Sequence, residues 1–156
     1  MKTLIAYGTK YGCAEKRAKS LSEKLNGEVD LCNLKNGKAI ELTEYDTVII
    51  GGSIYAGQIR KEVKQFVSKN LKQLLGKKIG LFVCCMGVDA SAATISNVFP
   101  KELVDHATVK DGFGGEFDTA KMNFLEKTMV KVIAKGNVPT APVGDLDGFA
   151  QAINNK

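Results

Sequence analysis

A short polar segment near the start of the chain carries residue types that bind anions. Residues 9–14 separate an apolar run at 3–7 from a helical pattern that begins at Ala14. Where a strand leads into a helix, the first backbone N–H groups of the helix are unpaired and can bind an anion. The sequence therefore predicts a phosphate-binding loop to which Thr9, Lys10, Tyr11 and Gly12 contribute two hydroxyls, a cation and close backbone approach. The loop matches neither G-x-x-x-x-G-K-[ST] nor G-x-G-x-x-G, so it does not support a Walker-type nucleotide site or a dinucleotide fingerprint.

Two further glycine-bearing segments follow apolar runs in the same way. The run at 47–50 ends in Gly51-Gly52-Ser53, and the run at 79–86 opens into Gly87-Val88-Asp89. Ligands of open α/β sheets bind outside the carboxyl ends of the strands, where the strand order reverses. We expect these two segments and the first loop to meet at that edge and to form one site.

Other catalytic arrangements find little support in the sequence. Cys13 is followed by Arg17 at four positions, whereas the phosphatase pattern places an arginine after five intervening residues. The chain has a single histidine, His106, which we interpret as a solvated or capping residue, and no Ser-His-Asp or paired-carboxylate arrangement. The four cysteines lack metal-type spacing, so we expect free thiols and no bound metal. Since no catalytic arrangement is found, we expect no catalytic side chain.

Strand-like and helical patterns alternate along the chain. Strands are predicted at 3–7, 28–34, 47–50, 79–86 and 107–113. Helices are predicted at 14–25, 63–75 and 91–98, from a cap at Asp118 or Thr119 to Gly136, and at 146–153. Such alternation with short loops is typical of right-handed crossovers and a parallel sheet covered on both faces. We predict one α/β domain over residues 1–156, a doubly wound, five-stranded parallel sheet.

Composition limits the classes of partner. The chain of 156 residues has a net charge of +5 and a pI near 9.0, which favours anionic partners. Its lysines are spread over several elements, so we do not expect nucleic-acid binding. No apolar run approaches the ~20 residues that span a bilayer, and no signal-peptide pattern opens the sequence. We expect a soluble, cytoplasmic protein, and contact with a membrane surface stays open.

Three segments resemble the flavodoxin family, in particular its single-domain branch that includes the quinone-coupled protoporphyrinogen oxidases. They read TLIAYGTKYGCAEK at the start, YDTVIIGGSIYAGQIRKEVKQFV in the middle and FGGEFDTAKMNFLEKTMVKVI before the tail. The resemblance implies the strand order 2-1-3-4-5 and non-covalently bound FMN at the junction of the first and third strands.

The resemblance also assigns the three loops. The family's phosphate loop falls on residues 9–14, where Cys13 and Ala14 replace the usual amide and hydroxyl side chains, so backbone amides are expected to hold the phosphate. The loops that flank the flavin ring fall on Ser53, Ile54, Tyr55, Ala56 and Gly57, and on Met86, Gly87, Val88 and Asp89. By this resemblance Tyr55 stacks on the ring, Gly57 offers a peptide near N5, and Asp89 places negative charge nearby.

Three functions stay open at this point. The first is an FMN protein that carries electrons between partners, with a redox partner protein or a quinone as acceptor. The second is an FMN-dependent oxidase of protoporphyrinogen IX that uses a quinone. The segment 114–119 is acidic and poor in aromatic residues, which departs from that branch. The third is a flavin-free interaction module, because a fold does not fix a function.

Overall fold

A mostly parallel sheet organises the structure, which is a computed structural model that describes residues 2–9, 13–36, 40–55, 58–85, 92–114 and 146–155. Its strands are β1 (Lys2–Gly8), β2 (Glu28–Asn33), β3 (Thr47–Tyr55), β4 (Gln58–Ile59), β5 (Lys78–Cys85) and β6 (Val109–Gly114). The order is β2-β1-β3-β5-β6, all parallel, and β4 pairs antiparallel with the end of β3. The predicted order 2-1-3-4-5 is confirmed.

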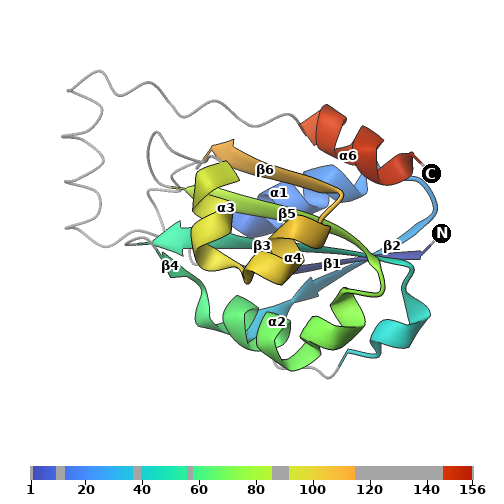
Figure 1. Cartoon of the computed structure of the whole chain (residues 1–156). Coiled ribbons are helices and arrows are strands. Elements are labelled where there is room, and N and C mark those ends of the chain that lie inside the picture. The colour runs from blue at the N-terminus through green and yellow to red at the C-terminus, as the bar shows by residue number, and fades with distance from the viewer. Residues whose placement is uncertain are drawn as a thin grey trace, which may run out of the picture.

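Helices cover both faces of this sheet (Figure 1). They are α1 (Cys13–Ser22), α2 (Lys61–Leu74), α3 (Ala92–Val98), α4 (Lys101–His106) and α6 (Leu146–Asn154), with short 3-10 helices at Leu34–Asn36 and Leu42–Glu44. One face packs against α1 and α6, and the other against α2, α3 and α4. The predicted helix from Asp118 or Thr119 to Gly136 lies outside the described residues.

Alternating side chains divide each central strand between two hydrophobic clusters. On β3, Val48 and Ile50 face α2, whereas Ile49 faces α1 and α6. This double burial explains why β1, β3 and β5 read as continuous apolar runs. At the outer strand β2, by contrast, Leu31 is 39% exposed, the one large exposed hydrophobic side chain in the described part of the chain.

The third strand is longer than its apolar run. We predicted a loop at Gly51-Gly52-Ser53, but β3 continues to Tyr55, so that prediction is wrong. The reason is close packing across the sheet: a Cβ on Gly51 would lie 2.0 Å from the Phe82 ring, and one on Gly52 would lie 2.7 Å from Ile59. The glycines leave space for these neighbours, so here they mark close approach inside a strand.

Helix boundaries differ from the prediction at two other places. The first helix ends at Ser22 rather than near Leu25, and Gly27 with φ of 80° turns the chain into β2. After Pro100 the chain forms α4, which the sequence analysis did not predict. In the described part of the chain no helix has the length and apolar character needed to cross a bilayer.

Candidate functional site

The carboxyl ends of β1, β3 and β5 lie at one edge of the sheet. Gly8 of β1 pairs with Gly52 of β3, so Thr9 and Ser53 directly follow two paired residues. Ile54 pairs with Cys85, the last residue of β5. The strand order reverses between β1 and β3, which makes this edge the position where such sheets bind ligands.

Part of the predicted site can be placed at this edge. Thr9 is half-buried after β1, Cys13 is the first residue of α1, Ala14 is fully buried, and Ser53, Ile54 and Tyr55 are the last residues of β3. The other predicted residues lie outside the described residues: Lys10, Tyr11, Gly12, Ala56, Gly57, Met86, Gly87, Val88 and Asp89.

Ser53 brings an unsatisfied hydroxyl to this edge. By strand alternation it shares the α1 face of the sheet with Ile49 and Gly51. Its Oγ is buried and has no hydrogen-bond partner among the described residues. Burying a hydroxyl without a partner costs about 1–3 kcal/mol in proteins. A polar ligand that bonds to Ser53 would remove this penalty.

The first turn of α1 contains the fully buried Ala14 and the acidic Glu15, whose carboxylate contacts two neighbouring side chains. Ala14, at the second helical position, has 0% exposure, so the helix approaches the sheet closely. Glu15 follows it in the first turn, where a carboxylate competes with any bound anion for the positive end of the helix. Glu15 accepts a hydrogen bond from Tyr7 Oη at 3.2 Å, and its Oε1 lies 3.8 Å from Lys19 Nζ.

Two arginines to which the sequence analysis gave no role at the site are partly or fully buried, and Arg60 lies next to the end of β1. Arg17 is only 7% exposed on the buried side of α1. Arg60 Nε donates to Glu62 Oε1 at 3.1 Å, and a Cβ on Gly8 would lie 3.0 Å from Arg60 Cβ and 3.2 Å from Glu62 Cγ. The alanine-rich spacing around Arg17 places it on the buried stripe, a signal that could have drawn attention to it.

Tyr7 should give the stability of the protein a distinct alkaline pH dependence. Burial and the adjacent Glu15 carboxylate raise the pKa of Tyr7 from 10.0 to about 12. A raised acid pKa stabilises the fold below pH 10, and this contribution is lost as pH rises from 10 to 12. We expect Tyr7→Phe to show a shallower fall of the free energy of unfolding over that interval, measured by urea denaturation at successive pH values.

Tyr45 supplies the internal comparison for this experiment. Burial and its hydrogen bond to Asp30, at 2.7 Å, raise the pKa of Tyr45 to about 12 as well. Tyr7→Phe should therefore leave some of the slope in place, whereas the double variant Tyr7→Phe/Tyr45→Phe should flatten it further. Equal slopes for Tyr7→Phe and the parent chain would contradict the assignment.

Two of the cysteines, Cys32 and Cys84, and the histidine considered for other chemistry lie on three different elements, β2, β5 and α4. Cys32 and Cys84 are not joined in a disulfide, and Cys84 is buried in the hydrophobic cluster under α1. His106 ends α4 as an exposed side chain, with Nε2 at 2.7 Å from the carbonyl of Lys77. Within the described ranges no group of three His, Cys, Asp or Glu side chains could hold a metal ion.

The strand order, the switch point and the glycine-lined edge define a flavodoxin-like α/β scaffold. The chain belongs to the flavodoxin family: the family described as "Flavodoxin domain" matches residues 4–140. Family membership and topology thus agree over most of the chain.

One sequence relative of this chain has a name that states an activity. The chain is 22% identical over 145 residues to a Leishmania major protein named protoporphyrinogen IX dehydrogenase [quinone]. The similarity covers 86% of this chain and 62% of the relative, so this chain spans less than two thirds of that protein.

Solved structures support the same fold. An archaeal flavodoxin superposes with a TM-score of 0.60 at 13% identity, covering 99% of this chain and all of that one. A flavoprotein from Lactobacillus acidophilus NCFM, solved in complex with FMN, gives a TM-score of 0.51 at 16% identity, covering 72% of this chain and 90% of that one. At these identities the likeness concerns the fold.

Proposed function

We propose that this chain is an FMN-binding redox protein that carries electrons between partners. The observation that carries the proposal is the buried Ser53 Oγ, which lacks a partner among the described residues and lies at the β1/β3 switch point. Buried hydroxyls are normally hydrogen-bonded, and the polar edge of a flavin would supply the partner that this hydroxyl lacks. Family membership and the FMN held by the Lactobacillus relative support the choice of cofactor.

The described residues divide the work of holding FMN. Thr9 and the backbone amides of Cys13 and Ala14 would hold the phosphate at the start of α1, since the side chains at 13 and 14 carry neither an amide nor a hydroxyl donor. Ser53, Ile54 and Tyr55 would flank the ring at the end of β3 and exclude water from it. FMN, when bound, supplies a ring that accepts and releases electrons.

We propose that the other predicted residues complete the three loops of the FMN site. Beside Thr9 the phosphate loop would include Lys10, Tyr11 and Gly12. The two flanking loops would be completed by Ala56 and Gly57 and by Met86, Gly87, Val88 and Asp89.

A titration tests the cofactor directly. Purified protein is freed of ligand and added to FMN while flavin fluorescence and visible absorbance are followed. We expect quenching that saturates at one FMN per chain at micromolar concentration. A protein that neither quenches FMN nor changes its spectrum contradicts the proposal and favours a flavin-free interaction module on this fold.

Quinone-coupled oxidation of protoporphyrinogen IX is the second candidate. The similarity to the Leishmania protein of that name, over 86% of this chain, is the observation that favours it. The test mixes FMN-loaded protein, protoporphyrinogen IX and a soluble quinone and follows porphyrin fluorescence. A rate above that of FMN and quinone alone supports this activity, and a rate equal to it leaves electron carriage as the function.

Replacing Glu15 should tighten FMN without affecting a flavin that lacks phosphate. In Glu15→Gln a negative charge leaves the first turn of α1, where charges contribute about 0.3–1 kcal/mol. We expect FMN affinity to rise about two- to fivefold, whereas riboflavin affinity stays constant. Fluorescence titration of both flavins measures this difference.

Glu23→Gln is the matched control, because it removes the same charge from an exposed position beyond the other end of α1. It should leave both affinities unchanged. If Glu15→Gln tightens riboflavin as much as FMN, the phosphate does not lie at the start of α1.

A further inference from the structure

A groove of about 380 Å³ runs along one side of α2 and is closed on the other side by the end of α3 and the residues after it. Its lining is mainly apolar, from Val63, Val67, Leu71, Val98 and Phe99. Lys64, Ser68 and Asn97 add polar groups to this lining. The volume lies within the range of about 300–1,000 Å³ that is common for binding pockets.

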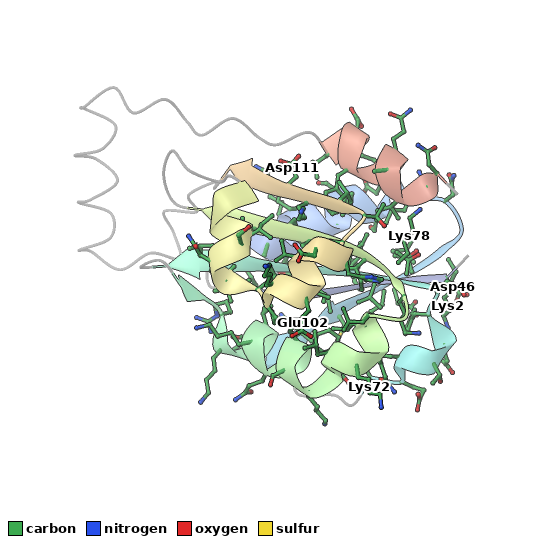
Figure 2. All side chains as sticks on the ribbon, viewed as in Figure 1. Lys2, Asp46, Lys72, Lys78, Glu102 and Asp111 are labelled. Carbon is green, nitrogen blue, oxygen red and sulfur yellow. The ribbon has the colours of Figure 1, made fainter. Side chains whose placement is uncertain are left out.

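The helix α2 forms one wall of the groove and has a strongly basic exposed surface, although Lys64 is the one lysine of this helix that lines the groove. Lys61, Lys64, Lys69 and Lys72 are all exposed, and Figure 2 shows Lys72 on the outer side of this helix, away from the sheet. The acidic residue of α2, Glu62, has a side chain only 14% exposed and is paired with Arg60. The exposed surface of α2 therefore carries positive charge that no neighbour on the same helix cancels.

The opposite wall carries no charge of its own. The helix α3, Ala92–Val98, has the sequence AATISNV. Beyond it α4 carries Lys101, Glu102 and Asp105, none of which lines the groove. We call the groove and the exposed lysines of α2 the basic groove.

One end of the basic groove reaches the candidate flavin edge. Ile59 of β4 lines the groove and pairs with Ile54, the residue after Ser53. Ile59 thus joins the groove to the end of β3, so a partner seated in the groove would lie beside the proposed flavin edge.

We infer that the basic groove docks an acidic, amphipathic segment of a protein partner; in taking this partner as the electron partner, the inference rests on the proposed function. Apolar side chains of the segment enter the groove, and its carboxylates face the lysines of α2. Grooves between helices bind amphipathic segments in this way. Complementary charge speeds association and selects the partner.

The shape of the surface favours a protein over a membrane. Binding in a lipid interface needs apolar side chains that protrude from the surface. The apolar residues of the basic groove are recessed instead: Val63, Val67 and Phe99 are 0%, 2% and 5% exposed, and Leu71 and Val98 are partly buried. The large exposed hydrophobic side chain of the described residues, Leu31, lies on β2.

A synthetic peptide serves as the probe. It carries leucines at helical spacing and glutamates between them, and a matched peptide carries lysines in place of the glutamates. We expect the acidic peptide to shift amide resonances of α2 and of residues 97–100 in the full-length, isotopically labelled chain, and added salt to weaken binding. The lysine peptide should leave these resonances in place.

Two substitutions on α2 distinguish binding in the groove from general attraction to the charge of the helix. Ser68 lines the groove and Gln65 does not, and both are exposed on the same helix. Ser68→Glu should weaken the acidic peptide about tenfold, whereas Gln65→Glu should weaken it at most threefold. Similarly, Lys64→Gln should lower affinity about threefold, and Lys24→Gln, on the α1 side of the sheet, should have no effect.

Other results would overturn the inference. One is an equal loss of peptide affinity in Ser68→Glu and Gln65→Glu, and another is the absence of any resonance shift with the acidic peptide. A third is binding of the chain to phosphatidylserine vesicles that Lys64→Gln abolishes, with no binding of the peptide. Concentration-dependent shifts of the same residues without peptide would assign the groove to a second copy of the chain. Each titration is run with and without FMN, so that a chain that fails to bind FMN is recognised separately from a groove that fails to bind peptide.

Discussion

Gly51→Ala is expected to destabilise the folded chain by about 3 kcal/mol, the upper part of the usual range for overpacked cores. A Cβ at this position would lie 2.0–2.3 Å from three atoms of the Phe82 ring. That ring cannot move aside freely, because Phe82 is fully buried and packs edge-on against Phe149 of α6, with centroids 6.4 Å apart. The substitution would therefore displace either β5 or α6.

Urea denaturation of the flavin-free chain measures this effect, and two further variants interpret it. Gly76→Ala adds a methyl group where the nearest atom is 3.5 Å away, so it should change stability by less than about 1 kcal/mol. Gly51→Ala/Phe82→Leu removes the ring and should lose less stability than the two single substitutions added together. Additive losses in the double variant would show that the ring is not the cause.

The central strands were accessible from sequence because burial on both faces leaves a local signal, whereas their order came from the resemblance to the flavodoxin family. Continuous apolar runs such as residues 79–86 identify the middle of a parallel sheet without knowledge of any partner. The extension of β3 to Tyr55 was not accessible, because it depends on Phe82 and Ile59 filling the space above two glycines. Those contacts join residues distant in sequence, and no local period reports them.

The candidate site shows the same division. The glycine-bearing segments after Tyr7 and Ile50 were predicted to share one edge of the sheet, and the structure places Gly8 beside Gly52 there although β3 continues to Tyr55. The pairs Tyr7–Glu15 and Arg60–Glu62 were not predicted, since each depends on how a helix is set against the sheet. The sequence therefore predicts where the candidate site lies, and the structure adds the charged pairs that surround that position.

The lysines of the chain differ in whether they bond within the protein or face solvent. The net charge of +5 predicted anionic partners but not their position. In the structure several lysines are used internally: Lys77 donates to the carbonyl of Tyr45, and Lys78 donates to the carbonyls of Ile153 and Asn155 near the chain ends (Figure 2). Among the described residues no such bond engages the exposed lysines of α2, which could therefore face a partner.

Ser53→Ala is expected to act in opposite directions on stability and on FMN binding. In the flavin-free chain it removes a buried hydroxyl that has no partner among the described residues, which should raise the free energy of unfolding by about 1 kcal/mol. In the presence of FMN it removes a hydrogen bond, and one such bond contributes about 0.5–1.5 kcal/mol. FMN affinity should therefore fall about two- to tenfold.

Thr3→Val provides a control within the same strand pair and on the same face of the sheet. Thr3 Oγ1 is buried without a partner among the described residues, like Ser53 Oγ, but it lies at the amino end of β1, opposite the candidate site. Thr3→Val should stabilise the flavin-free chain similarly and leave FMN affinity unchanged. Urea denaturation and fluorescence titration of both variants measure the two quantities. If Ser53→Ala stabilises the chain without weakening FMN, the Ser53 hydroxyl is a defect of the core and not part of the site, and the assignment of the flavin edge to the end of β3 loses its main support.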